Sequence, residues 1–251
     1  MLIQITNQCN NNCPHCLHNS VINGGQMTLE TYEKVLNWIE ILKPWAVVIT
    51  GGEPFTHPKL YEMCSNLRCK FIVTSNGNFI LNPFLKRMAI AIGNLPNCMG
   101  IQVTSVPTLY PNYWEIRKHV KELNDIPSVN LCLDIDIYIK DLGRARGKYP
   151  VNTVYPAASC VNTHLVAKQT HSLQEMIQFF NQVGKYCEPL IDYQGNIHCS
   201  ESWLCPSYGN LDTPMDIVWQ KMKDTPPCGK CANWKAMQNM QKYSRVLQIL
   251  K

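Results

Sequence analysis

Short apolar runs alternate with longer amphipathic stretches through the first two thirds of the chain. The runs predict strands over residues 2–6, 46–50, 70–74, 100–106 and 129–139. A helix is predicted to end at Pro44, because apolar residues recur at helical spacing at Leu29, Tyr32, Val35, Leu36, Ile39 and Leu42. Further helices are predicted over residues 57–67, 82–92 and 112–123. This alternation predicts an α/β fold with a parallel sheet, in which ligands bind at the carboxyl ends of the strands.

The pattern changes after about Asp141. A basic, turn-prone segment follows at residues 143–147, then a helix is predicted over residues 172–183 and a hairpin over residues 190–198, turning at Gln194-Gly195-Asn196. A turn at residues 209–211 is expected to lead into one more helix. We therefore predict two domains: an α/β domain over residues 1–155 and a small α+β extension over residues 156–251.

Composition narrows the class of protein. The chain has 251 residues, 45% hydrophobic and 16% charged, which suits one large domain with a small appendage. No apolar run approaches the roughly 18 to 20 residues of a membrane-spanning helix, and the N-terminus lacks the features of a signal peptide. A soluble, cytoplasmic protein is expected. The net charge is +5, but the basic residues are scattered, which argues against nucleic acid as a partner.

Thirteen cysteines in a chain without an export signal suggest metal binding more than disulfides. Cys9, Cys13 and Cys16 follow the first strand in a C-x3-C-x2-C run. Three thiolates on one loop can hold three irons of a cubane cluster and leave the fourth iron open. The alternatives are a zinc site completed by His15 or His18, and thiols with no shared role.

With its neighbouring motifs, this loop resembles that of the radical S-adenosylmethionine (SAM) enzymes. Gly51-Gly52-Glu53-Pro54 after the second strand resembles the glycine-rich motif that lines the methionine group of SAM in that family. Thr74-Ser75-Asn76-Gly77 after the third strand is similar to its Thr-Asn-Gly turn. The resemblance implies a partial (β/α)6 radical SAM barrel. This barrel is expected to bind SAM, and to bind a 4Fe-4S cluster through Cys9, Cys13 and Cys16.

The resemblance also implies the residues that contact SAM. His15 stands where the family commonly has an aromatic residue, and its ring can stack on adenine. The family's Ser-x-Asp ending is missing from the fourth strand, so Thr104 or Ser105 either contacts SAM or faces the core. Gly143-Arg144-Ala145 resembles a segment whose Arg contacts cofactor or substrate, with a solvated Arg as the alternative. The same comparison implies contacts from Gly51, Gly52, Glu53, Pro54 and Asn76.

Glu53 and the two glycines before it can also be interpreted from their chemistry alone. Glu53 offers an acceptor to the ligand, or it is an acid at the start of a helix. The glycines allow the backbone to approach a ligand closely, so a side chain at Gly52 is expected to collide with the ligand more than with the fold.

A second group of cysteines resembles the SPASM or twitch extension, which binds auxiliary 4Fe-4S clusters. The expected ligands of one such cluster are Cys187, Cys199, Cys228 and Cys231, with Cys205 as a spare. The alternatives are a structural zinc in the same cysteines and a three-cysteine site with an open iron. The remaining thiols are interpreted as core or surface residues: Cys64, Cys69, Cys98, Cys132 and Cys160. Asp134 and Asp136 alternate on one strand, either as acids inside the barrel or as solvated residues.

The resemblance implies cleavage of SAM to a 5'-deoxyadenosyl radical that abstracts a substrate hydrogen. An auxiliary cluster with four cysteine ligands is expected to accept an electron, which favours an oxidoreductase that dehydrogenates a small polar metabolite. Cys9 lies close to the start of the chain, so no leader-binding domain is expected before it. A peptide maturase remains an alternative, as does a nonenzymatic Fe-S or zinc protein. The expected partners are the substrate and an external reductant such as flavodoxin or ferredoxin, with no nucleic acid and no membrane.

Overall fold

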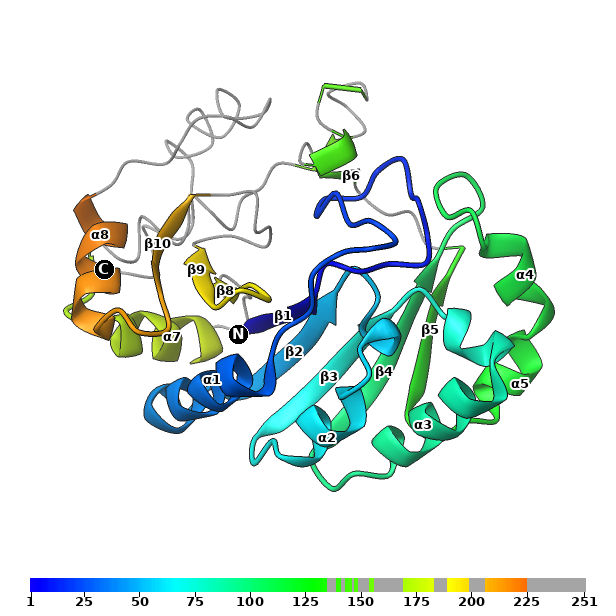
Figure 1. Cartoon of the computed structure of the whole chain (residues 1–251), viewed down its shortest axis with the longest axis horizontal. Coiled ribbons are helices and arrows are strands. Elements are labelled where there is room, and N and C mark those ends of the chain that lie inside the picture. The colour runs from blue at the N-terminus through cyan, green and yellow to red at the C-terminus, as the bar shows by residue number, and fades with distance from the viewer. Residues whose placement is uncertain are drawn as a thin grey trace.

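The computed structural model describes residues 1–134, 139–140, 143–145, 147–148, 154–155, 169–182, 189–198 and 206–224. Its main feature is a curved sheet with the strand order β10-β9-β8-β1-β2-β3-β4-β5 (Figure 1). The neighbours from β1 to β5 all pair in parallel, as the βα pattern predicts. These strands are β1 (Leu2–Thr6), β2 (Ala46–Gly51), β3 (Lys70–Ser75), β4 (Cys98–Ser105) and β5 (Val129–Leu133).

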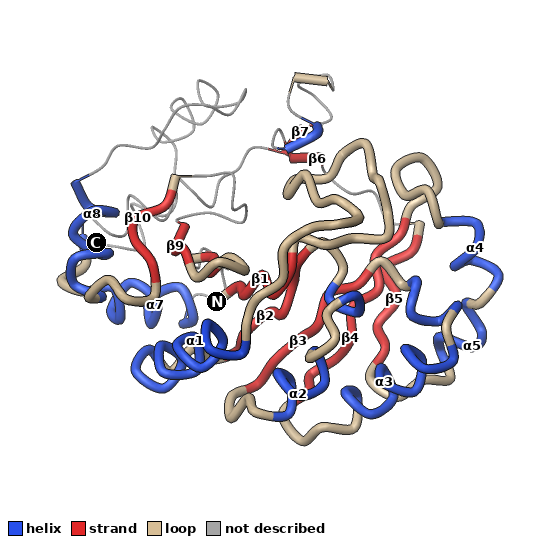
Figure 2. The backbone as a smooth tube through the Cα atoms, in the orientation of Figure 1, coloured by secondary structure: helices blue, strands red, loops and turns tan. Residues whose placement is uncertain are grey.

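Helices follow the strands along the outer side of this sheet (Figure 2). They are α1 (Leu29–Leu42), α2 (Leu60–Ser65), α3 (Pro83–Gly93), α4 (Tyr113–Lys118) and α5 (Val120–Asn124), with short 3-10 turns η1 (Pro54–Thr56) and η2 (Asn78–Leu81). The predicted helix before Pro44 is confirmed. Thr28 caps its start by accepting a hydrogen bond from the Thr31 amide at 3.1 Å, and Lys43 ends it in the left-handed conformation.

Three predicted elements are shorter or divided in the structure. The helix expected over residues 57–67 is confined to α2, because His57 ends η1 in an extended conformation. The helix expected over residues 112–123 is divided at His119, whose backbone leaves the helical region. The strand expected over residues 129–139 ends at Leu133, because Asp134 has a φ of 58° and turns the chain.

The core lies between the sheet and its helices. Alternate residues of the strands are fully buried on the helix-facing side, including Ile3, Ile49, Val73 and Val103. They pack in one cluster with helix residues such as Val35. Burying each large apolar side chain contributes about 1.5–3 kcal/mol. The opposite residues of the same strands are left to face the inside of the curved sheet.

The C-terminal part extends the same sheet. β8 (Leu190–Ile191) pairs in parallel with β1 and forms the predicted hairpin with β9 (Asn196–His198), and β10 (Ser207–Asn210) follows at the edge. Trp38 of α1 donates from Nε1 to the Leu211 carbonyl oxygen at 3.2 Å. Strands from both sides of residue 155 thus share one sheet, and the domain boundary there stays a prediction.

The remaining elements are short. α7 (Leu173–Gln182) and α8 (Met215–Asp224) confirm the two helices predicted in this region. β6 (Ile139–Lys140) pairs with β7 (Val154–Tyr155) apart from the main sheet, and η3 (Gly143–Ala145) lies between them in sequence. None of the helices in the described part is long and apolar enough to cross a membrane.

Candidate functional site

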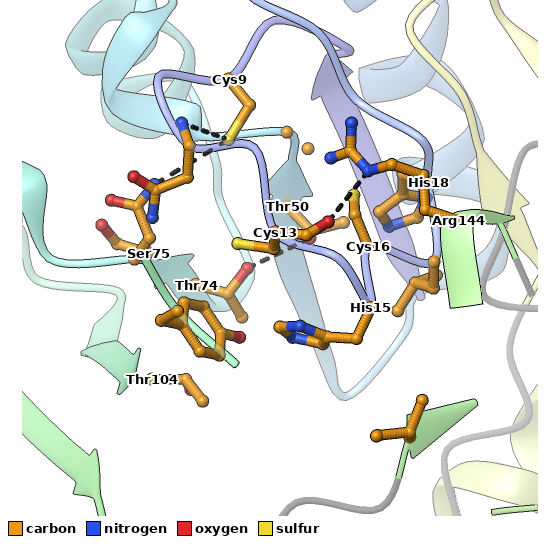
Figure 3. Close-up of a pocket in the computed structure, with 17 residues that line it drawn as sticks. Cys9, Cys13, His15, Cys16, His18, Thr50, Thr74, Ser75, Thr104 and Arg144 are labelled. Carbon is orange, nitrogen blue, oxygen red and sulfur yellow. Dashed lines mark hydrogen bonds between the residues drawn. The ribbon is translucent and has the colours of Figure 1, made fainter. Parts of the chain in front are cut away.

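A cavity of about 310 Å³ opens at the carboxyl ends of β1 to β4, where the parallel sheet predicts a ligand site (Figure 3). Its walls come from the loops after these strands, from Thr104 near the end of β4, and from β6 and η3. The lining residues are Cys9, Asn11, Cys13, His15, Cys16, Leu17, His18, Thr50, Gly51, Gly52, Thr74, Ser75, Asn76, Thr104, Tyr110, Ile139 and Arg144.

All three cysteines of the C-x3-C-x2-C loop line this cavity. Cys9 and Cys13 are buried and Cys16 is partly exposed, and all three are free thiols. Backbone amides donate to two of the sulfurs: Asn11 to Cys9 Sγ and Ser20 to Cys16 Sγ, both at 3.4 Å. Burial raises the pKa of the Cys9 thiol to about 11 and that of Cys13 to about 12. Metal binding to such thiols therefore has to displace protons.

This donor set fits an iron-sulfur cluster. Three thiols face one cavity, and N–H groups are already directed at two of their sulfurs, those of Cys9 and Cys16; such hydrogen bonds to the ligands tune iron-sulfur clusters. In a cubane each cysteine binds a different iron, so the sulfurs need not converge on one point. A zinc site does need convergent ligands, and no group of three Cys, His, Asp or Glu side chains in the described part of the chain has that geometry.

Gly51 and Gly52 line the cavity, but a Cβ added at either position would collide with backbone atoms of the protein. A Cβ at Gly52 would lie 2.3 Å from the Gln8 carbonyl oxygen and 2.9 Å from Cys9 Cβ. The Gly52 amide donates to the Thr6 carbonyl at 2.8 Å. The expectation that a Gly52 side chain collides with the ligand more than with the fold is therefore wrong. The glycine lets the end of β2 pack directly against the cysteine loop.

Glu53 and Pro54 are not among the lining residues, and both are buried behind the cavity wall. The Glu53 carboxylate accepts hydrogen bonds from the Phe55 amide at 3.1 Å, Ser75 Oγ at 2.9 Å and the Asn76 amide at 2.7 Å. Burial outweighs these hydrogen bonds and raises its pKa to about 7. Of its two interpretations, the structure shows the acid at the start of a helix, η1, with an added link to the end of β3.

The ends of β3 and β4 place polar groups on the wall. Asn76 lines the cavity, and Nδ2 of its side chain lies 3.9 Å from Cys9 Sγ. Thr104 also faces the cavity, whereas Ser105 is fully buried on the other side of the strand. This separates the two candidates left open by the sequence, because neighbouring residues of a strand point to opposite faces.

His15 and Tyr110 form one corner of the cavity. Their rings meet edge to face with centroids 4.9 Å apart. Burial lowers the pKa of His15 to about 4, so the imidazole is neutral at pH 7 and brings no charge to the site. Sequence reasoning missed Tyr110 and Thr50, and it named Thr74 only as part of the turn after the third strand, without a role in the site. The Thr50 and Thr74 hydroxyls lie 3.1 Å apart. The threonines had a signal in the sequence, since each stands at the end of a strand.

Arg144 lines the cavity but uses its guanidinium on the cysteine loop (Figure 3). It donates from Nε to the Cys13 carbonyl at 2.9 Å, and from Nη1 to Asn12 Oδ1 at 2.8 Å and the Ser20 carbonyl at 3.0 Å. The sequence predicted a ligand contact or a solvated side chain for Arg144, and neither role includes these hydrogen bonds to the cysteine loop. Gly143 allows the two segments to approach this closely, because a Cβ there would lie 2.2 Å from the Cys16 carbonyl oxygen.

The other predicted residues lie elsewhere. Asp134 pairs with Arg117 at 2.7 Å and bonds Tyr113, so both of its partners come from α4. Cys64 is buried in the core, while Cys69, Cys98 and Cys132 are partly buried thiols. Asp136, Cys160, Cys205 and the four expected auxiliary ligands, Cys187, Cys199, Cys228 and Cys231, lie outside the described residues.

Comparisons with known proteins agree with this geometry. Residues 3–119 match the sequence profile of the radical SAM superfamily. The structure is similar to BtrN in complex with AdoMet and 2-DOIA, with a TM-score of 0.56 and 13% identity, covering 95% of this chain and 85% of BtrN. At that identity the likeness concerns the fold alone. No curated protein sequence matches the chain.

Two further solved structures are less similar. SuiB of Streptococcus suis bound to the precursor peptide SuiA has a TM-score of 0.48 and 13% identity, covering 89% of this chain and 64% of SuiB. The structure of anSMEcpe with AdoMet and the Cp18Cys peptide has a TM-score of 0.42 and 16% identity, covering 93% of this chain and 86% of that protein. Residues 3–119 thus match the radical SAM superfamily model, and the mostly parallel α/β sheet is typical of the partial barrel of radical SAM enzymes.

Proposed function

We propose that this protein is a radical SAM enzyme whose cluster is held by Cys9, Cys13 and Cys16. The observation that carries the proposal is the placement of three free thiols on one wall of a cavity at the ends of parallel strands. When bound, the cluster and SAM supply the electron and the 5'-deoxyadenosyl radical that abstracts a substrate hydrogen. The electron comes from an external reductant such as flavodoxin or ferredoxin.

The residues around the thiols orient the ligands. Asn76 Nδ2, Thr50 Oγ1 and Thr104 Oγ1 offer hydrogen bonds to the polar groups of SAM, and the neutral His15 ring offers an apolar face to adenine. Glu53 acts through others, because it holds the Ser75 hydroxyl and the Asn76 amide in place. The structure of BtrN with AdoMet in a similar fold supports SAM as the cosubstrate.

The polar side chains on the inner face of the sheet favour a small polar molecule as the substrate. Gln4 pairs with Thr50, and Thr74 pairs with Gln102, so one row of polar side chains crosses four strands. The Thr74 and Thr50 hydroxyls join the two halves of this row at 3.1 Å. Because Thr50 and Thr74 line the cavity, the whole row belongs to the inner face. Amides and hydroxyls in such a row suit hydroxyl or amino groups better than an apolar ligand.

We further propose that Cys187, Cys199, Cys228 and Cys231 bind one auxiliary 4Fe-4S cluster. Four cysteine ligands leave no iron open to substrate, so the function proposed for this cluster is to take an electron from the substrate radical. The net reaction is then a two-electron dehydrogenation, and the protein is an oxidoreductase.

The first test is iron content and SAM cleavage. Anaerobically reconstituted protein should carry about eight irons if two 4Fe-4S clusters are present. The triple variant Cys9→Ala, Cys13→Ala, Cys16→Ala should keep about half of that iron and form no 5'-deoxyadenosine after reduction. Unchanged iron in the triple variant, or zinc in place of iron, would contradict the proposal.

The second test separates the two clusters. The double variant Cys228→Ala, Cys231→Ala should still cleave SAM but should lose the oxidised product. Because metal binding can also contribute to folding, the variant must first be shown to be compact by size-exclusion chromatography. Full product from the folded variant would exclude the electron-acceptor role, and one zinc per chain would make the extension structural.

A further inference from the structure

Three asparagine side chains from three different loops form a closed ring of hydrogen bonds beside the cysteine loop. Asn11 donates to Asn112 Oδ1 at 2.8 Å, Asn112 donates to Asn78 Oδ1 at 2.7 Å, and Asn78 donates back to Asn11 Oδ1 at 3.0 Å. Asn11 lies between Cys9 and Cys13, Asn78 begins η2 after β3, and Asn112 precedes α4. We call these three residues the asparagine ring.

The ring is connected to Cys9 from two sides. The backbone amide of Asn11 donates to Cys9 Sγ at 3.4 Å, so the ring member itself directs an N–H at the sulfur. Asn112 also donates to the Asn76 carbonyl at 2.9 Å. The Asn76 side chain in turn donates to Asn10 Oδ1 at 2.9 Å and lies 3.9 Å from Cys9 Sγ. The three loops therefore meet around one cysteine.

The chemistry of the carboxamide explains why asparagine occupies all three positions. Each member has to donate from Nδ2 and accept at Oδ1 at the same time, which neither a carboxylate nor a hydrophobic side chain can do. The ring is neutral, so it adds no negative charge next to the thiolates that bind a metal. Hydrogen bonds arranged in a cycle also strengthen one another, so opening the ring at any member weakens the rest.

We propose that the asparagine ring is a positioning device that sets the conformation of the segment between Cys9 and Cys13, and so aims the Asn11 amide at the Cys9 sulfur. This inference rests on the proposed cluster at these cysteines. In the described part of the structure neither Asn78 nor Asn112 has a hydrogen bond to the sulfur of Cys9, Cys13 or Cys16, so they act on the cluster through Asn11 and Asn76. Their effect should appear in how firmly the cluster is held and in its reduction potential, which hydrogen bonds to the sulfurs help to set.

The experiment compares the full-length protein with Asn78→Ala, Asn112→Ala and the double variant, each reconstituted anaerobically. Two quantities are measured for the N-terminal cluster: the rate of iron loss to a chelator, and the midpoint potential from a redox titration followed by electron paramagnetic resonance. Each single variant should lose iron about tenfold faster than the wild type. Its potential should become more negative, because a hydrogen bond to sulfur favours the reduced cluster. The double variant should match the single variants, because the ring is opened only once.

Asn82→Ala is the matched control. Asn82 Oδ1 caps α3 by accepting from the Phe84 and Leu85 amides at 2.9 and 3.2 Å, in the same stretch of chain as Asn78 but outside the ring. This variant should weaken the helix and leave both cluster measurements unchanged. Asn112→Leu, which has a similar size but neither an Nδ2 donor nor a charge, replaces Asn112→Ala if the latter does not fold, and it should show the same faster iron loss.

Three outcomes would overturn the inference: wild-type rates and potentials in the ring variants, effects that multiply in the double variant, or an equal effect of Asn82→Ala. A wild-type protein that takes up no iron would overturn the proposed function itself, and the ring's role with it. That result is distinct from the other three, because in those the wild type carries its cluster.

Discussion

Nε of Arg144 donates a hydrogen bond to the carbonyl oxygen of Cys13 at 2.9 Å, across 131 residues of sequence. The Arg144 amide also donates to the Cys16 carbonyl at 3.0 Å, so η3 holds the cysteine loop through backbone and side chain together. A guanidinium can serve several carbonyl acceptors in one plane, which a lysine ammonium cannot do. The cysteine loop is therefore shaped by a segment that lies beyond the five parallel strands.

Arg144→Ala should weaken this loop. The free energy of unfolding of the metal-free protein should fall by about 1–3 kcal/mol, because two partly buried carbonyl oxygens and the exposed Asn12 side chain lose a charged donor. Iron loss to a chelator should become about 10- to 100-fold faster. For Arg144→Lys, both the free energy of unfolding and the rate of iron loss should lie between those of Arg144→Ala and the wild type. Urea denaturation and iron analysis measure the two effects, and wild-type values for both would show that the guanidinium is not needed to hold the loop.

Gly52→Ala should damage the fold and the cluster site together. The new Cβ would meet the Gln8 carbonyl oxygen at 2.3 Å, and backbone cannot move aside as a flexible side chain can. We expect a loss of about 1–3 kcal/mol of stability and a lower iron content. Gly147→Ala is the control, because Gly147 has a φ of 67° and no atom of the described residues lies within 4 Å of its added Cβ. It should cost about 1–2 kcal/mol from backbone strain and leave the iron unchanged.

One other result would support the original expectation that a side chain at Gly52 collides with the ligand more than with the fold. In that case Gly52→Ala would keep its stability and its iron but bind SAM more weakly, as measured by equilibrium dialysis.

Glu53 should make stability depend on pH. Its pKa is raised from 4.5 to about 7 in the folded protein, mainly by burial. The folded state therefore binds this proton more tightly than the unfolded state. The resulting stabilisation is fully present below pH 4.5 and is lost as the pH rises through about 7, by at most about 1.4 kcal/mol per pH unit.

Glu53→Gln removes this titration. The difference in free energy of unfolding between the wild type and the variant, measured by urea denaturation from pH 4.5 to 8, isolates Glu53 from other groups. The difference should change across this window in the direction of a less stable wild type at higher pH. A constant difference would show that Glu53 keeps an ordinary pKa in the folded protein.

Gln4→Met should stabilise the metal-free protein. Gln4 is fully buried, and neither Oε1 nor Nε2 of its side chain has a hydrogen-bond partner in the structure as described. An unsatisfied buried amide costs about 1–3 kcal/mol, and methionine has a similar shape without polar atoms. Gln102→Met is the control, because Gln102 donates to Cys132 Sγ at 3.5 Å and is partly exposed, so no gain is expected there. A loss of stability at Gln4 would show that a water or ligand normally meets this amide.

Local pattern was enough to predict most of the barrel. The strands β1 to β4 and the helix α1 lie within one or two residues of their predicted positions, because each has a clear apolar period or run and a clear end. The region after β5 was harder to predict. One left-handed residue, Asp134, ended the strand expected to reach residue 139, and nothing in the apolar pattern marks that turn.

Some residues of the site were predicted correctly from the sequence and others were not. Spacing alone placed Cys9, Cys13 and Cys16 together on one loop, because they are at most seven residues apart. Register decided that Thr104 faces the cavity and Ser105 does not, and register depends on pairing with the neighbouring strands. Glu53 was assigned to the ligand by resemblance, whereas its burial and its bonds to Ser75 and Asn76 show a structural link.

The sequence by itself determined the order of strands and helices, the parallel sheet and the loop that carries the three cysteines, because all of these follow from local spacing. Only the tertiary structure decided which atoms surround that loop. Arg144 lies 131 residues from Cys13, and Asn112 lies 101 residues from Asn11. Contacts between residues so far apart in sequence depend on how the chain packs around the whole sheet, and a hydrogen bond from nitrogen to oxygen forms only when the two atoms come within about 3.2 Å.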